Sequence, residues 1–193
     1  MLASDLVSGR NGLPRSDYEK PALRDLVRTI PDYPKPGIQF RDITTLLGHG
    51  PGFAASVEWL AEAVEGAEAI AGMEARGFIF GAAVAARLRR PFLPIRKAGK
   101  LPCAVIGVDY ELEYGLDRLE MDPSAVAPGQ QVAIVDDLLA TGGTALAATE
   151  LLRLAGAEVR RAAFVIDLPD LGGSAKLASQ AVDVRTLMGF EGD

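Results

Sequence analysis

Short apolar runs alternate with longer amphipathic stretches over most of the chain. Apolar runs of four or five residues between Gly, Pro and charged residues are typical of strands buried on both faces, whereas apolar spacings of three and four are typical of helices. The pattern predicts strands at residues 69–72, 92–95, 131–135 and 162–166. It predicts helices at residues 18–30, 53–64, 78–88 and 144–154. This alternation indicates an α/β fold with a mostly parallel sheet flanked by helices.

The segment at residues 31–47 breaks the alternation. It is too rich in proline for a helix, yet it holds Ile38, Phe40 and Ile43, so we expect an extended loop packed on the core. Before it, residues 1–17 are rich in Ser, Gly, Asp and Arg and are expected to form a flexible N-terminal arm.

A second irregular segment, residues 97–130, carries Gly, Pro, Asp and Glu throughout. Its alternating pieces at 104–108 and 110–112 predict an inserted β-hairpin, or hood, at about residues 97–123, because the segment is longer than a routine connection. We expect residues 18–193 to form one domain. This domain would include the N-terminal helical and loop segment and the hood, which is inserted in the α/β fold.

Composition narrows the possible functions. The 193 residues are 49% hydrophobic and 24% charged, which fits one domain with a sizeable core. A net charge of -6 argues against a broad surface for nucleic acid or an anionic membrane. With Cys103 and His49 as its single cysteine and histidine, the chain is not expected to form internal disulfides, Cys/His zinc sites or a Ser-His-Asp triad. No signal peptide or membrane-spanning run is evident, so we expect a soluble cytoplasmic protein.

One local cluster of positive charge stands out against the acidic background. Six of the chain's 20 Lys and Arg residues lie between residues 87 and 100: Arg87, Arg89, Arg90, Arg96, Lys97 and Lys100. Such a cluster repels itself unless it is solvated or given an anion. We expect about half of these residues to be ordinary surface.

The sequence IVDDLLATGGT at residues 134–144 has the features of a phosphate pocket. Asp136 and Asp137 follow a buried strand, where open α/β sheets place their ligands, and two adjacent carboxylates need a cation or hydroxyls beside them. The glycines let the backbone approach a ligand, and the next helix begins with free N–H groups for an anion. No P-loop or GxGxxG motif is present. The segment therefore predicts a site for a phosphorylated ribose.

This segment also resembles the phosphoribosyl-diphosphate motif of type I phosphoribosyltransferases, in the form typical of members that act on adenine. Segments that resemble the same family follow in order at residues 32–44, 72–81, 95–102 and 110–121, and the resemblance spans residues 20 to about 190. It implies transfer of the 5-phosphoribosyl group from its diphosphate to N9 of adenine, giving AMP and diphosphate in purine salvage. It also implies Mg2+ carried mainly by the substrate diphosphate, with no assigned protein ligand, and a homodimer.

The resemblance assigns roles around the phosphoribosyl diphosphate. Asp136 and Asp137 would accept hydrogen bonds from the ribose hydroxyls and stabilise a positive transition state. The residues that would hold the 5-phosphate are Ala140, Thr141, Gly142, Gly143 and Thr144. The expected pyrophosphate ligands are Arg96, Lys97 and Lys100. Family members tend to extend the arginine across a dimer interface.

Further roles concern the base and the chemistry. Phe40 would stack on adenine while Leu168 covers its other face. Backbone groups of Gln39 and Arg41 would read its edge. Arg76 would lie near the base and ribose, with Glu74 and Gly77 shaping its loop. In the hood, Glu113 would handle the proton and Tyr114 would help to close over the substrates. The expected catalytic residues are Glu113, Asp137 and Arg76.

Two alternatives remain open from the residues alone. A regulator could use this fold to sense phosphoribosyl diphosphate and bind nucleic acid, but it would need a basic face or DNA-binding module. A transferase acting on hypoxanthine, guanine or xanthine would share the chemistry but need a donor toward the 6-oxo group. Two positions differ from the family pattern: Gln39 is often apolar there, and Asp122 stands where many members carry His.

Overall fold

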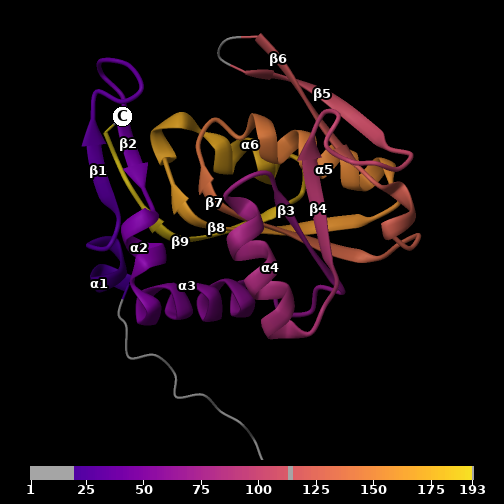
Figure 1. The fold of residues 1–193 in the computed structure, drawn as a ribbon, viewed down its shortest axis with the longest axis horizontal. Helices are drawn as coiled ribbons and strands as arrows, with labels where there is room; N and C mark the ends of the chain where they lie inside the picture. Colours follow the sequence, from indigo (N-terminus) through magenta and orange to yellow (C-terminus); the bar gives the residue numbers. More distant parts are fainter. Residues whose placement is uncertain (1–19, 113–114, 193) are drawn as a thin grey trace, which may run out of the picture.

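In the computed structural model, which describes residues 20–112 and 115–192, helices lie on both faces of a central sheet (Figure 1). Among the described residues this sheet has seven strands, in the spatial order β5 (Ile106–Leu112), β6 (Gly115–Met121), β4 (Phe92–Lys97), β3 (Ala69–Met73), β7 (Gln131–Leu139), β8 (Glu158–Asp167) and β9 (Asp183–Gly189). Neighbours from β4 to β9 run parallel, and β5 and β6 form an antiparallel hairpin beside β4. The predicted fold class is confirmed.

Six α-helices occur in the described part of the chain: α1 (Lys20–Arg24), α2 (Thr44–Gly48), α3 (Gly50–Ala63), α4 (Gly77–Leu88), α5 (Gly143–Leu154) and α6 (Gly173–Ser179). Short 3-10 turns occupy Pro123–Ala125 and Pro169–Leu171. His49 caps α3 by accepting a hydrogen bond from the Gly52 amide. No helix in the described ranges is long and apolar enough to cross a membrane.

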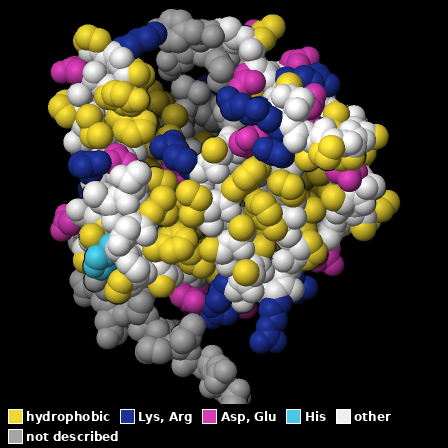
Figure 2. Space-filling view, in the orientation of Figure 1, with side chains coloured by type: hydrophobic (Ala, Val, Ile, Leu, Met, Phe, Trp, Pro, Cys, Tyr) yellow, Lys and Arg dark blue, Asp and Glu magenta, His cyan; other side chains and the backbone are white. Residues whose placement is uncertain are grey.

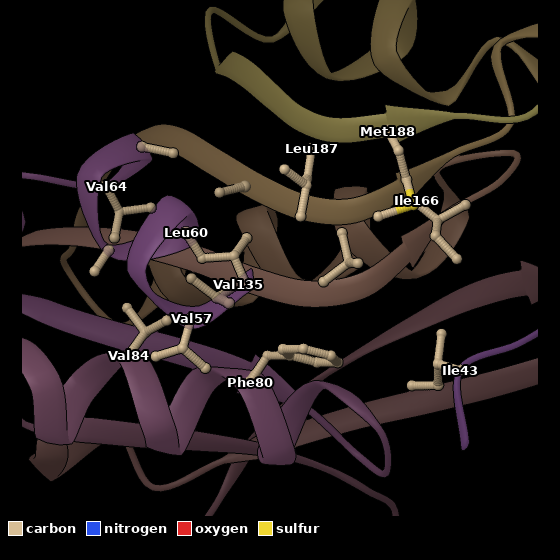
Figure 3. Packing of buried hydrophobic residues seen from close by; sticks show 14 of the residues in the cluster. Ile43, Val57, Leu60, Val64, Phe80, Val84, Val135, Ile166, Leu187 and Met188 are labelled. Carbon is tan, nitrogen blue, oxygen red and sulfur yellow. The ribbon is translucent and has the colours of Figure 1, made fainter. Parts of the chain in front are cut away.

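The two faces of the sheet are covered by different helices, and this explains the near-continuous apolar strands. On one face, Leu60 of α3 and Phe80 of α4 pack toward Val135 and Leu187 (Figure 3). On the other, residues of α5 and α6 pack against the alternate strand positions, among them Ile134. The central strands β3, β7 and β8 are therefore apolar on both sides over most of their length. The helices and strands predicted from this pattern after residue 50 are all present, some longer than expected.

The predicted helix at 18–30 is wrong in its second half. Its start lies outside the described residues, as does the predicted arm at 1–17. The described helix ends at Arg24, and β1 (Arg28–Pro31) follows as a strand. This strand pairs antiparallel with β2 (Gln39–Asp42), so its backbone hydrogen bonds go to a partner that helical spacing does not reveal.

The segment expected to be an extended loop therefore contains β2 and α2. Ile43 is buried as expected, whereas Phe40 is half-buried and Ile38 is exposed. The small β1–β2 sheet lies next to the end of β9, and Figure 1 shows the two side by side at the left.

The predicted hairpin is present in the hood, but its two strands are not the ones predicted. The alternating pieces at 104–108 and 110–112 belong largely to the single strand β5, whose partner is β6. The hairpin continues the main sheet because β6 also pairs with β4, at Arg96↔Glu120 and Lys97↔Leu119. We call β5 and β6 the hood hairpin. The strand β9 and the helix α6 were not predicted.

Candidate active site

A pocket of about 240 Å³ opens at the carboxyl ends of β3 and β7. Its walls are the turn at residues 73–76 and the segment at 136–145, which follow adjacent parallel strands. The carboxyl edge of a parallel sheet is where ligands bind in open α/β folds. The pocket thus brings together the predicted phosphate loop and the loop that carries Arg76.

Two adjacent carboxylates line this pocket at the end of β7. Asp136 is 9% exposed and Asp137 4%. Burial, reinforced by the negative charge of Asp137, raises the pKa of Asp136 well above its usual range. Burial also raises the pKa of Asp137, and the Arg76 guanidinium opposes that rise. Holding both carboxylates ionised is energetically costly, and positive charge beside them reduces that cost.

Arg76 is the cation nearest to this pair. Its Nε lies 2.9 Å from Oδ2 of Asp137, and its side chain is 41% exposed. The same Oδ2 is buried and has no hydrogen-bond partner in the described part of the chain. Although Arg76 forms an ion pair with this oxygen, the buried acceptor still lacks a hydrogen-bond donor among the described residues. A buried acceptor without a donor costs stability, so its position in the pocket wall indicates that a ligand donor completes it.

The turn before α5 depends on close backbone packing. Gly142 has φ +83°, and a Cβ there would lie 3.0 Å from Gly173. A Cβ on Gly173 would lie 2.3 Å from the Ala140 carbonyl oxygen. Lys176 of α6 donates to the Thr141 carbonyl at 2.9 Å. Contacts from α6 therefore hold the ATGGT turn in place. The first residues of α5 face the pocket.

Gly77 holds the first turn of α4 against the acidic pair. A Cβ at this position would lie 2.5 Å from Oδ1 of Asp136. The same Oδ1 accepts a hydrogen bond from the Asp137 amide at 2.8 Å. Gly77 was expected to shape the Arg76 loop. The structure gives a physical reason, because a side chain at residue 77 would displace the Asp136 carboxylate.

Glu74 holds Arg96 in place within the same chain. Arg96 contacts Glu74 through Nε and Nη2, each at 3.2 Å, and donates through Nη1 to the Lys100 carbonyl. These contacts lower the pKa of Glu74, chiefly through the hydrogen bond from Arg96. The peptide bond between Glu74 and Ala75 is cis.

The remaining basic residues divide into two groups. Lys97 pairs with Asp117 of the hood hairpin at 2.8 Å, and the Lys100 side chain is exposed. Arg87 pairs with Glu58 at 2.6 Å on the far end of α4, consistent with ordinary surface. Figure 2 shows Lys and Arg side chains on both sides of the hollow below the hood hairpin, with acidic side chains among them.

The β1–β2 sheet brings Phe40 toward the pocket. Its ring centre lies 5.7 Å from the Arg76 guanidinium carbon and 5.2 Å from the Tyr33 ring. Gln39 begins the same strand and is half-buried. Leu168 follows β8 and packs into the core with 7% exposure. Phe40 thus joins Arg76 and Asp137 in one connected group.

The Arg41 side chain is buried among groups remote from the pocket lining. It donates to the Thr29 hydroxyl at 2.8 Å, and its guanidinium lies 4.8 Å from the centre of the Phe190 ring. It also reaches the carbonyls of Glu191 and Gly192. The side chain therefore connects β2 to the C-terminal segment.

Sequence reasoning missed several residues of this region. Lys176, Tyr110 and Asp117 come close to the phosphate loop or the basic cluster only through the tertiary fold. Glu113 and Tyr114 lie outside the described residues, so their expected roles stay predictions. No group of three or more His, Cys, Asp or Glu side chains in the described ranges is arranged to hold a metal ion.

The parallel sheet, the acidic pair beside a glycine-rich phosphate turn, and the hairpin at the sheet edge define a class of α/β enzymes that handle a phosphorylated sugar. The family model described as the phosphoribosyl transferase domain matches residues 44–187. At 67% identity, the chain is similar to adenine phosphoribosyltransferase from Erythrobacter litoralis over 172 residues, which are 88% of this chain and 97% of that relative.

Solved structures agree with this relationship. The fold is similar to adenine phosphoribosyltransferase from Thermoanaerobacter pseudethanolicus with a TM-score of 0.85 and 46% identity, covering 89% of this chain and 100% of that one. The enzyme from Saccharomyces cerevisiae, complexed with an imino-altritol bisphosphate and adenine, has a TM-score of 0.81 and 36% identity over 88% and 98% of the two chains. The chain belongs to the phosphoribosyltransferase family, among the adenine phosphoribosyltransferases.

Proposed function

We propose that the pocket transfers the 5-phosphoribosyl group from 5-phospho-α-D-ribose 1-diphosphate to N9 of adenine, giving AMP and diphosphate. The observation that carries this assignment is the buried acidic pair beside the glycine turn, in which Oδ2 of Asp137 has Arg76 as an ion-pair partner but accepts no hydrogen bond from the described residues. A phosphate alone would need only the turn, whereas a phosphorylated ribose also brings hydroxyl donors to the carboxylates. The adenine bound in the Saccharomyces cerevisiae enzyme supports the choice of base.

The acidic pair has a direct role in the reaction. As the bond between C1 of the ribose and the diphosphate oxygen breaks, its electron pair leaves with the diphosphate and the ribose gains oxocarbenium character. A developing positive charge favours the ionised forms of Asp136 and Asp137, whose pKa values burial has raised. Fixed negative charge at this point stabilises the transition state.

The base and its proton are handled on the opposite side of the ribose. Phe40 stacks on adenine, with backbone groups of Gln39 and Arg41 along its edge and Leu168 on the other face. N9 of adenine bonds to C1, and Glu113 accepts the proton that N9 releases. Tyr114 helps the hood to exclude water from the activated ribose. The Phe40 ring beside Arg76 supports this arrangement.

Oxygen-rich surroundings fit Mg2+, which prefers oxygen ligands and keeps many of them from substrate and water. The pocket wall holds the carboxylates of Glu74, Asp136 and Asp137. When bound, Mg2+ neutralises negative charge on the diphosphate. Arg96, Lys97 and Lys100 supply the remaining positive charge.

We extend the proposal to a homodimeric enzyme of the cytoplasm. Arg96 would contribute to the partner subunit's site, which requires it to leave Glu74. Sedimentation should then give twice the chain mass of 20.4 kDa. An Arg96→Ala variant should lose diphosphate affinity, and a monomeric species with full activity would contradict the dimer proposal. Cell fractionation tests the location.

The function itself is tested with purified protein, Mg2+, phosphoribosyl diphosphate and one purine at a time. We expect AMP from adenine and little product from hypoxanthine, guanine or xanthine. A mononucleotide formed preferentially from a 6-oxopurine would overturn the choice of base. Absence of every nucleotide product, together with a salt-sensitive shift of DNA mobility, would favour a regulator instead.

A further inference from the structure

Three side chains from three different strands meet at the base of the hood hairpin. Lys97 ends β4, Tyr110 lies in β5, and Asp117 lies in β6. Tyr110 and Asp117 are cross-strand partners, and Lys97 pairs with Leu119, two residues from Asp117. Since side chains two residues apart on a strand share a face, all three project from the same face of the hairpin.

The Asp117 carboxylate is the centre of this group. Its Oδ2 accepts from Lys97 Nζ at 2.8 Å and from the Tyr110 hydroxyl at 3.1 Å. Its Oδ1 accepts from the Arg118 amide at 2.8 Å. The Asp117 side chain is 19% exposed and that of Lys97 52%. A carboxylate with three donors is firmly held, whereas the lysine still faces solvent.

The same face of the hairpin touches the phosphate turn. A Cβ on Gly143 would lie 3.4 Å from the Glu111 carbonyl oxygen and 3.9 Å from the Tyr110 ring. A side-chain hydrogen bond with Thr144 lowers the pKa of Tyr110, against the larger rise caused by burial. Tyr110 is thus placed between Asp117 and the turn expected to hold the 5-phosphate.

We propose that Asp117 is a positioning residue for the diphosphate end of the substrate: it holds Lys97 and Tyr110 in place and competes with the diphosphate for Lys97. The inference rests on the proposed function because it takes Lys97 as a diphosphate ligand. In the free protein Asp117 neutralises Lys97, so an incoming diphosphate must share or replace that partner. The competition weakens binding and also eases release of the product.

The opposite face of the hairpin provides a matched control. There Asp109 pairs with Arg118 at 3.0 Å, and the Asp109 side chain is 65% exposed. Asp109→Asn removes the same charge from the same hairpin without touching Lys97 or Tyr110. Any general effect of charge on an anionic ligand should appear in both variants.

The test is calorimetric titration of the full chain with inorganic diphosphate and Mg2+, together with steady-state kinetics. For Asp117→Asn we expect diphosphate to bind about two- to fivefold more tightly, the range given by losing one partly exposed ion pair. KM for phosphoribosyl diphosphate should fall with it. The value of kcat should also fall because Lys97 is no longer held as charge develops on the leaving group. Asp117→Glu should restore both values.

A double-mutant cycle separates positioning from folding. In a Lys97→Ala background, Asp117→Asn should no longer change diphosphate affinity, since the group it acts through is absent. Unchanged or weaker diphosphate binding in Asp117→Asn, or an equal gain in Asp109→Asn, overturns the proposal. If diphosphate binding depends on Asp117 as expected but the wild-type protein makes no AMP, the proposed function is overturned while the competition between Asp117 and diphosphate for Lys97 is supported.

Discussion

At the residue scale, the pocket places two carboxylates where folding alone would not favour them. Asp136 and Asp137 are buried side by side, with Arg76 as the nearby cation. A carboxyl group whose pKa rises on folding stabilises the fold below its unfolded-state pKa, and that stability is lost as pH rises through the folded-state pKa. The acidic pair therefore costs stability at neutral pH, as expected of groups kept for function.

Asp136→Asn should accordingly increase stability at pH 7 and reduce turnover. We expect a melting temperature higher by about 2–4 °C for each kcal/mol gained, and turnover lower by about 100-fold because one transition-state charge is removed. The stability difference should be greatest at neutral pH and shrink toward pH 4. Thermal melts across this range, with an AMP assay, measure both effects.

A matched control for that variant is Asp122→Asn. Hydrogen bonds from the Ser124 side chain and amide lower the pKa of Asp122. The ionised Asp122 carboxylate therefore stabilises the folded protein at neutral pH, unlike the acidic pair, and this stabilisation is lost as pH falls. Asp122→Asn should lower the melting temperature at pH 7 and leave turnover nearly unchanged. A lower melting temperature for Asp136→Asn at pH 7 would contradict the inference that the acidic pair costs stability at neutral pH.

Gly77→Ala tests the close approach of α4 to the same carboxylates. The added Cβ would lie 2.5 Å from Oδ1 of Asp136, so Asp136 or the helix must move. We expect turnover to fall at least about tenfold, since displacements of 1 Å in a catalytic group have such effects. Gly48→Ala, with nothing within 4 Å of its Cβ, should retain full activity. Equal activity of the two variants would argue that the pocket tolerates the shift.

At the scale of elements, the β1–β2 sheet is the part that brings Phe40 to the pocket. It is held by contacts with the end of β9 and the residues beyond it. Two guanidinium carbons lie close to the Phe190 ring, that of Arg24 at 4.2 Å and that of Arg41 at 4.8 Å from its centre. A planar guanidinium over a ring combines packing with electrostatic attraction. The C-terminal segment thereby sets the position of β2, whose Phe40 is proposed to stack on the base.

Arg41→Lys should separate base binding from ribose binding. Lysine cannot reproduce the planar stacking on Phe190 and the fork of hydrogen bonds, so β2 should lose about 1 kcal/mol of support. We expect KM for adenine to rise severalfold while KM for phosphoribosyl diphosphate changes little. Arg160→Lys, at a surface ion pair with Glu158, is the control. Equal changes in both KM values would show that Arg41 acts on the whole pocket.

At the scale of the whole molecule, the sheet carries the two halves of the site on neighbouring strands. The Arg76 loop follows β3 and the phosphate turn follows β7, and these strands pair in parallel at Ala71↔Ile134. The hood hairpin extends the same sheet through β4. A ligand that spans these loops links segments far apart in the sequence, so its binding should stabilise the whole fold.

Phosphoribosyl diphosphate with Mg2+ should therefore raise the melting temperature of the wild-type protein. At a concentration 100 times the dissociation constant the stabilisation is about 2.7 kcal/mol, or roughly 5–10 °C for a chain of this size. Chelation of Mg2+ should remove most of the shift because the diphosphate charge is then unscreened. Thermal melts with and without EDTA measure this. A full shift that persists in EDTA would count against a role for the metal.

The candidate site could be predicted from the sequence to the extent that its parts are local. The acidic pair and the ATGGT turn occupy nine consecutive residues, 136–144, and their chemistry follows from residue types at fixed spacing after an apolar strand. Their positions in the pocket wall agree with that expectation. The contact between Gly77 and Asp136 joins segments 59 residues apart. The periodicity of apolar residues along the sequence cannot predict a contact between such distant segments.

By itself, the sequence determined the parallel α/β core and the phosphate turn, because burial on both faces requires continuous apolar strands and a phosphate turn requires glycines. Tertiary structure alone decided that residues 28–31 form a strand, that Arg41 packs against Phe190, and that Asp117 holds Lys97. Strand pairing and ion pairs depend on which groups lie within a few ångströms after folding. Local patterns constrain each partner separately, but only the assembled sheet brings the partners together.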